Sequence, residues 1–323
     1  MIRVNNIHLS LDYDDKSVRK AVAQQLRIEE KSIKSCKIFR RSVDARKKDS
    51  IYFLTTVDAE LNINEDKVCK KCGNAQIARK YEYNQMKFGN APSPIVVGAG
   101  PAGLFAALIL ARSGANPILI ERGRDVDRRT ADVNRFWTSG QLDTTSNVQF
   151  GEGGAGTFSD GKLNSGTKDI RQRKVLEEFV SHGAPDEILY NAKPHIGTDM
   201  LKGTIKNIRN EIIELGGKVM FETKLVSMAF SDNKLKAITV ETANGDEIIE
   251  TDNIILAIGH SARDTFLMLQ NRNIAMEQKS FSVGARIEHS QEMINKSQYG
   301  KAYKKLPAAD YKMAVQLECG RGV

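Results

Sequence analysis

Hydrophobic residues in the first 61 positions follow two periods, and each period predicts a different element. Apolar residues alternate from Ile2 to Leu11, which predicts a strand, whereas Val18, Val22 and Leu26 have helical spacing. Residues 32–39 and 51–61 are two further predicted strands, separated by a polar turn. This order of elements predicts a small ferredoxin-like α+β domain. Residues 62–90 are polar, and we interpret them as a connector.

The pattern changes near residue 93, where a short β-branched run leads into three glycines and an Ala/Leu-rich segment. This order predicts a strand, a turn and a helix that stops at Gly114, with a second strand over residues 116–120. Further along, the periodicity predicts two amphipathic helices over 170–182 and 198–215, four short strands between 218 and 250, and a buried strand over 251–259. We therefore expect an α/β Rossmann-like domain with an inserted β-meander.

The glycine motif VGAGPAG, which ends at Gly103, fits a dinucleotide-binding turn in its expected context. Its first glycine allows the tight turn, its second lets the backbone approach a pyrophosphate, and its third lets the helix pack on the strand. The helix N-terminus attracts the anion. We predict cofactor contacts at Gly98, Gly100, Pro101, Ala102 and Gly103.

An acidic residue, Glu121, ends the second predicted strand. At this position of a dinucleotide fold, a carboxylate accepts hydrogen bonds from both ribose hydroxyls of an adenosine. Strand, glycines, helix, strand and acid in register are much stronger evidence than the glycine spacing alone.

A second glycine-rich segment, GEGGAGTFSDGK over residues 151–162, fits two phosphate-binding patterns at once. From Gly151 it matches a dinucleotide fingerprint, and from Gly156 it matches a P-loop ending in Lys162. Both patterns work only at a strand-to-helix turn, whereas the preceding residues are polar. Leu163 occupies the position where a P-loop needs Ser or Thr for magnesium. We therefore expect neither pattern to apply, with no strand entering the loop.

Composition places the 323-residue chain among globular proteins, with 41% hydrophobic residues and enough length for two or three domains. Its first residues lack the basic and then apolar layout of a signal peptide. The apolar stretch 94–111 contains several Gly and Pro residues and fits a nucleotide turn, so we do not expect it to span a membrane. These features predict a cytoplasmic protein without a membrane partner.

The net charge of +8 is concentrated in residues 1–90, which hold 19 Lys/Arg and 12 Asp/Glu. A basic domain is compatible with nucleic acid or another acidic partner. The sequence of this segment shows no interleaved aromatic and basic residues of the kind that single-strand platforms use. We therefore favour a solvated surface over a nucleic-acid-binding one.

The four cysteines do not form a disulfide framework in a chain of this length. Cys69 and Cys72 form a single C-x-x-C pair, which supplies half of a tetrahedral zinc site, and no second pair or nearby His completes it. They lie in the predicted connector, away from the strand-to-helix context of redox pairs. We expect neither a metal nor a redox role.

Several longer motifs together resemble a known group of flavoproteins. The VGAGPAG turn, the ERG triplet that starts at Glu121, and LAIG ending at Gly259 are typical of the glutathione-reductase-type FAD-binding fold. The chain most resembles bacterial FAD-dependent dehydrogenases that have a small basic N-terminal α+β domain. The matching motifs are RRSVDARKK over 40–48, FGEGGAGTFSDGKL over 150–163, AIGHSARDTF over 257–266 and SVGARIEH over 282–289.

This resemblance implies FAD as cofactor and an oxidoreductase activity on a substrate that it does not identify. It also implies flavin contacts from the second glycine-rich loop and backbone contacts to the adenine at the start of the meander. The cofactor residues that it adds are Arg122, Gly153, Gly154, Gly156, Leu225, Ala257 and Gly259. NAD(P)H as electron donor is a hypothesis that the fold alone supports.

No catalytic residue follows from the sequence. Charged and imidazole side chains lie after the A-x-G turn and in the later segment, and we interpret each of them as structural: His260, Arg263, Asp264, Arg286 and His289. Arg263 and Asp264 are expected to form a local ion pair and helix cap.

The expected domains are a basic α+β domain with its connector (1–90), an FAD-binding domain (91–279) and the start of an incomplete substrate domain (280–323). No strand ending in Gly-Asp follows Gly259, so we expect the chain to be truncated at its C-terminus. Two alternatives stay open: a flavin-containing nucleic-acid-binding protein, and a catalytically silent flavoprotein remnant.

Overall fold

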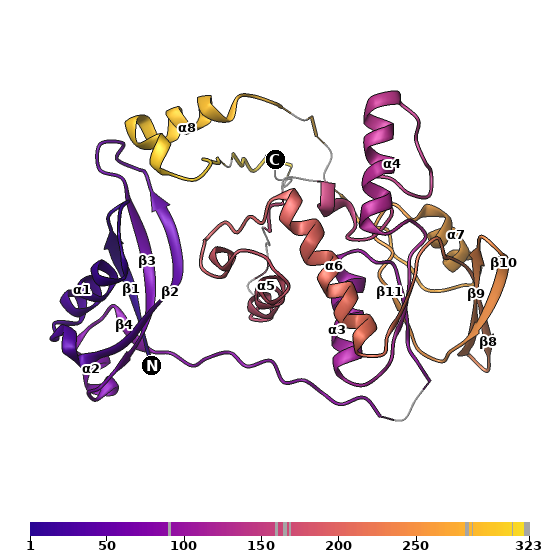
Figure 1. Ribbon diagram of the computed structural model, residues 1–323, viewed down its shortest axis with the longest axis horizontal. Coiled ribbons are helices and arrows are strands. Elements are labelled where there is room, and N and C mark those ends of the chain that lie inside the picture. Colours follow the sequence, from indigo (N-terminus) through magenta and orange to yellow (C-terminus); the bar gives the residue numbers. More distant parts are fainter. Residues whose placement is uncertain are drawn as a thin grey trace. The chain divides into compact units, whose positions relative to one another are not determined.

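The computed structural model describes residues 1–89, 92–158, 161–163, 167, 169–281, 284–285, 287–311 and 313–319 (Figure 1). The chain forms two compact units. The first comprises Met1–Lys80, Tyr190–Ala192 and Ser280–Val323, and the second comprises Tyr81–Leu189 and Lys193–Lys279. The domain boundary expected between residues 90 and 91 falls outside the described residues.

A four-stranded antiparallel sheet forms the first unit, with the strand order β2-β3-β1-β4. Helices α1 and α2 lie on the same side of this sheet (Figure 1). Val18, Val22 and Leu26 of α1 are buried in its core, as their spacing predicts. The elements are β1 (Ile2–Leu9), α1 (Asp15–Leu26), the 3₁₀ turn η1 (Glu30–Ser32), β2 (Ile33–Asp44), β3 (Tyr52–Leu61), α2 (Glu65–Lys71) and β4 (Ala75–Ile77).

Part of the expected connector is regular structure, which corrects the prediction for residues 62–90. Asn64 caps α2 by accepting a hydrogen bond from the Lys67 N–H at 2.9 Å. β4 then pairs with β1 at the edge of the sheet. The helix was not predictable from the sequence, because Val68 is its single buried residue and one apolar position does not produce a hydrophobic period.

Two later segments complete the first unit. α8 (Gln291–Tyr299) and η4 (Gly300–Lys305) precede Leu306, which packs against the core of the sheet. Residues 190–192 extend the edge of β2, because the Arg41 N–H donates to the Tyr190 carbonyl at 2.6 Å and the Ala192 N–H donates to the Arg41 carbonyl at 2.8 Å.

The second unit contains a four-stranded parallel sheet with the order β11-β5-β6-β7. Its strands are β5 (Ile95–Val97), β6 (Ile118–Ile120), β7 (Lys218–Met220) and β11 (Ile254–Leu256). The predicted β-α-β unit is present, with α3 (Pro101–Arg112) joining β5 to β6. Buried residues of α3 and α6 (Thr198–Glu214) belong to the same hydrophobic core. The remaining helical elements are α4 (Val126–Ser139), η2 (Ala155–Phe158), α5 (Gln172–Ser181), η3 (Asp186–Leu189) and α7 (Arg263–Asn271).

The expected meander is an antiparallel sheet of β8 (Lys224–Ser231), β9 (Lys234–Thr242) and β10 (Gly245–Glu250). The first of the four short strands predicted here, β7, pairs with β6 in the parallel sheet. Among the described residues, no helix is both long and apolar enough to cross a membrane.

Candidate functional site

A cavity of about 690 Å³ lies at the carboxyl ends of β5, β6 and β11. In parallel α/β sheets, ligands bind at this edge of the strands. Segments that are far apart in the sequence contribute to its wall. The structure places there the following predicted cofactor residues: Gly98, Gly100, Pro101, Ala102, Glu121, Arg122, Gly154, Gly156, Leu225, Ala257 and Gly259. Of the predicted residues, Gly103 and Gly153 lie outside this lining.

The N-terminus of α3 supplies hydrogen-bond donors at the cavity. Gly100 is the N-cap residue, Pro101 follows it, and the first bond along the helix runs from the Leu104 N–H to the Gly100 carbonyl at 2.9 Å. The N–H groups of Ala102 and Gly103 precede that bond and have no acceptor within the helix. Because Ala102 also lines the cavity, this helix end can bind an anion there.

Two glycines of the turn are required by close packing. A Cβ on Gly98 would lie 2.5 Å from the carbonyl oxygen of Ala257, and the φ of Gly98 is +99°. A Cβ on Gly103 would overlap the carbonyl oxygen of Gly98. The sequence correctly assigned Gly103 to helix–strand packing, and this contact explains why it is not part of the cavity wall.

The Glu121 carboxylate is a hydrogen-bonding centre for three loops. One oxygen accepts from the Ala99 N–H at 2.7 Å, and the other accepts from the N–H groups of Gly123 at 2.9 Å and Gly151 at 3.0 Å. Glu121 is only 6% exposed. A carboxylate accepts about four hydrogen bonds, so about one position remains for a ligand hydroxyl. The sequence predicted bonds to two ribose hydroxyls and did not predict the three backbone bonds.

The side chain of Arg129, which is completely buried, holds the second glycine-rich loop in place. Its guanidinium donates to the backbone carbonyls of Asn147 at 2.9 Å, Val148 at 3.0 Å and Glu152 at 2.5 Å. Burial lowers the pKa of Arg129 to about 10, against the opposing effect of Glu121 and Glu152. Arg129 therefore stays charged at neutral pH and fixes the backbone path of the loop.

Glu152 anchors the same loop to two helices. Its Oε2 atom accepts from the Val126 N–H at the start of α4 at 2.7 Å and from Arg209 of α6 at 2.9 Å. The side chain is fully buried, and Oε1 has no hydrogen-bond partner among the described residues. Burial raises the pKa of the Glu152 carboxyl, although Arg209 opposes this effect.

These anchors bring the glycine-rich loop against the first nucleotide turn. The Gly153 N–H donates to the Ala99 carbonyl at 2.8 Å. A Cβ on Gly154 would lie 3.0 Å from Pro101 Cδ and 3.2 Å from Gly100 Cα. No strand enters the loop among the described residues that precede it, as the polar approach predicted, and Ala155–Phe158 within the loop form a 3₁₀ turn. Ser159 and Asp160 of this motif lie outside the described residues.

A charged cluster holds the start of α7 beside the cavity. Arg122 donates two hydrogen bonds to Asp264, at 3.1 and 3.0 Å, and one to Thr265 at 2.9 Å, while Lys224 pairs with Asp264 at 2.9 Å. Partial burial alone would raise the pKa of Asp264, but the hydrogen bonds from Arg122 and Lys224 bring it well below its ordinary value. The predicted pairing and capping by Asp264 is wrong, because Asp264 does not pair with Arg263 and α7 has no side-chain cap.

The other candidate side chains are dispersed. His260 lines the cavity and contacts Ser261 through Nε2 at 3.4 Å. His289 is in the first unit, where it bonds to Tyr311 at 2.7 Å. Arg286 lies outside the described residues.

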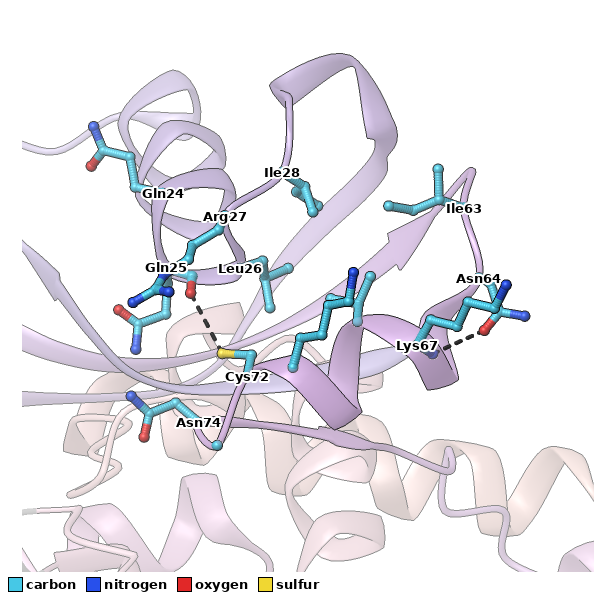
Figure 2. Close-up of a pocket in the computed structure, with 13 residues that line it drawn as sticks. Gln24, Gln25, Leu26, Arg27, Ile28, Ile63, Asn64, Lys67, Cys72 and Asn74 are labelled. Carbon is cyan, nitrogen blue, oxygen red and sulfur yellow. Dashed lines mark hydrogen bonds between the residues drawn. The ribbon is translucent and has the colours of Figure 1, made fainter.

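A second hollow, of about 890 Å³, lies beside the C-x-x-C pair in the first unit (Figure 2). Within it, the Cys72 thiol donates to the Gln25 carbonyl at 3.4 Å. Burial, with Asp66 and Glu65, raises the pKa of Cys69, so its reactive thiolate is disfavoured. Both cysteines pack against the sheet core. Among the described residues, no group of three or more His, Cys, Asp or Glu could hold a metal ion.

Three protein families match parts of the chain. Residues 93–133 match an FAD binding domain, and residues 280–323 match the C-terminal domain-like family of FAD-dependent proteins. Residues 1–60 match a domain of unknown function. The FAD binding domain match covers the glycine turn, β6 and Glu121, which form part of the cavity wall.

A relative in Clostridium beijerinckii, an uncharacterized protein, is 47% identical over 324 residues. The alignment covers 98% of this chain, and the chain spans 60% of the length of that relative. Solved structures show only weak overall similarity. Thermovibrio ammonificans THI4 is 15% identical with a TM-score of 0.38, covering 57% of this chain and 64% of its own. A flavocytochrome c3 fumarate reductase is 18% identical with a TM-score of 0.34, covering 56% and 36%. The family matches at residues 93–133 and 280–323 support a flavoprotein.

Proposed function

We propose that this protein is an FAD-dependent oxidoreductase with a glutathione-reductase-type Rossmann fold, and that FAD binds in the cavity at the ends of β5 and β6. The observation that carries the proposal is the N-terminus of α3, where the N–H of Ala102 has no acceptor within the helix and lies at a cavity that both glycine-rich loops line. The volume of the cavity is within the usual range of about 300–1,000 Å³ for cofactor sites.

Different residues of the cavity bind different parts of FAD. The N–H group of Ala102 donates to the pyrophosphate, and Glu121 Oε2 accepts a hydrogen bond from the adenosine ribose. Backbone near Leu225 contacts the adenine, and the loop at Gly154 lies along the middle of the cofactor. When bound, the isoalloxazine supplies the redox chemistry, while these protein groups bind and orient it.

Three finer assignments belong to the same proposal. NAD(P)H reduces the flavin, as in many proteins of this fold. The first unit is a ferredoxin-like domain, which its β-α-β-β-α-β order and its strand order support. The site works on a small-molecule substrate in the cytoplasm.

The absorption spectrum of the purified chain tests this function. We expect a visible flavin absorption band that co-elutes with the protein, and chromatography of the released flavin should identify FAD. ADP should compete with FAD, because the α3 end of the site binds the ADP portion. Anaerobic NADH or NADPH should bleach the band. A chain that neither carries flavin nor binds added FAD would contradict the assignment.

A further inference from the structure

The first unit carries a second candidate surface, on the side of the β2-β3-β1-β4 sheet that faces away from α1 and α2. We call it the open face, and six side chains define it: Arg3, His8, Lys37, Phe39, Arg40 and Tyr52. The register pairs Arg3 with Asp58 and Asp58 with Lys37, so these side chains point to one face. The intervening residues Val4 and Val57 are buried in the core on the other face.

Aromatic rings on the open face are stacked and accessible. The rings of His8 and Tyr52 stack with their centroids 4.4 Å apart and an angle of 23° between their planes. The Arg3 guanidinium lies 3.3 Å from the centroid of Phe39. His8 is exposed, and Tyr52 and Phe39 are half-buried. The His8–Tyr52 stack and the Arg3–Phe39 stack are thus both held in place before any ligand arrives.

Positive charge lies beside these rings. Arg3 is neutralised by a two-bond pair with Asp58, at 2.7 and 2.8 Å. Lys37 and Arg40 on β2 are both exposed. Residues 33–50, which form β2 and the following turn, contain seven Lys/Arg and two Asp. Exposed positive charge on β2 therefore lies on the same face as the aromatic rings.

We propose that the open face binds single-stranded RNA. Bases that are not paired can stack on the His8–Tyr52 pair and on the Arg3 guanidinium over Phe39, and phosphates can pair with Lys37 and Arg40. RNA is favoured over DNA because the Thr56 hydroxyl, which donates to Asn5 Oδ1 at 3.2 Å, provides a polar site on this face for a 2′-hydroxyl. The sequence indicated only the basic charge of this segment, because the rings come from three strands that only the fold brings together.

Fluorescence anisotropy with a 5′-fluorescein-labelled 12-nucleotide oligouridine RNA tests the proposal on the full chain. Tyr52→Leu removes the ring and should weaken binding by about tenfold. Tyr52→Phe keeps the ring but loses the hydroxyl that donates to Asp44 at 3.0 Å, and it should bind like the wild type. Circular dichroism and urea midpoints, compared with those of the wild type, establish that both variants are folded.

Charge variants test whether RNA binds to the open face specifically or to any basic surface of the first unit. Lys37→Ala with Arg40→Ala should reduce the slope of log Kd against log salt by about 0.7 per lost phosphate contact. The control, Lys16→Ala with Lys20→Ala, removes two exposed charges from α1 on the opposite side of the sheet and should change little. Equal losses in both double variants, unchanged binding in Tyr52→Leu, or no binding at about 50 mM salt would overturn the proposal. Equal or tighter binding of a 12-nucleotide oligothymidine DNA would overturn the choice of RNA.

Discussion

The two glycine-rich segments, Gly98–Gly103 and Gly151–Gly156, share the spacing G-x-G-x-x-G but are built in different ways. In the first, a strand enters and a helix leaves, and glycine is needed because backbone packs on backbone. In the second, no strand enters among the described residues, and the buried side chains of Arg129 and Glu152 fix the loop.

The difference shows that glycine spacing alone does not define a phosphate site. In the first segment, the spacing follows from the local β-α-β geometry and can be recognised from neighbouring residues. In the second, the conformation depends on partners as distant as Arg209, which the residues next to the loop do not reveal. Each of the following variants weakens one of these two kinds of support.

The largest effect is expected from Arg129→Leu. This change leaves three backbone carbonyls of the second loop without their donor and removes a buried positive charge beside Glu152. We expect the free energy of unfolding to fall by about 3–5 kcal/mol in urea denaturation. Arg128→Leu is the control, since that exposed side chain pairs with Asp125 and Glu222 alone among the described residues, and its loss should cost at most about 1 kcal/mol. Similar costs for both variants would show that Arg129 is not the anchor.

Gly98→Ala tests the first segment. The added Cβ would meet the Ala257 carbonyl oxygen at 2.5 Å, and the residue has a positive φ, so we expect a loss of about 2–3 kcal/mol in the same assay. Gly114→Ala places an alanine at a similar positive φ, +83°, where no atom lies within 4 Å of the added Cβ, and should cost about 1 kcal/mol. If the two losses are equal, backbone conformation rather than close packing explains the glycine.

Gly154→Val addresses the contact between the two segments. A side chain there would push the second loop away from Gly100 and Pro101, and we expect FAD affinity to fall about tenfold, which is about 1.4 kcal/mol. Gly114→Val adds the same side chain at another positive φ, outside the cavity. It should change the Kd for FAD less than twofold, which is less than about 0.4 kcal/mol. Flavin fluorescence titration measures both. An unchanged Kd in Gly154→Val would separate the loop from the cofactor.

The smallest effect concerns Asp264→Asn, which breaks the cluster with Arg122 and Lys224. The folded-state pKa of Asp264 lies below its unfolded value, so its stabilisation is present above the ordinary pKa of about 3.9 and is lost as the pH falls toward the folded value. Because the side chain is 43% exposed, we expect only about 0.5–1 kcal/mol at pH 7. The difference between variant and wild type should shrink below about pH 4 and also in high salt. A constant difference across this pH range would mean that charge is not its cause.

Local patterns in the sequence predicted the β-α-β unit, the meander strands and the region around the cavity. Buried polar partners were not predictable, because the environments of Arg129 and Glu152 depend on residues 18 to 57 positions away. Glu121 shows the same limit. We predicted a ligand contact from its position, but its carboxylate also accepts hydrogen bonds from three backbone N–H groups. Glu121→Ala would therefore destabilise the domain as well as weaken cofactor binding, and it cannot isolate the ribose contact.

A crystal structure of the chain with FAD tests the central claim most directly. We predict the pyrophosphate at the N-terminus of α3 and one adenosine ribose hydroxyl within about 3.2 Å of Glu121 Oε2, the oxygen with the remaining acceptor position. The loop at Gly154 should lie against the middle of the cofactor. FAD bound elsewhere, or every ribose hydroxyl more than about 5 Å from Glu121, would contradict the assignment.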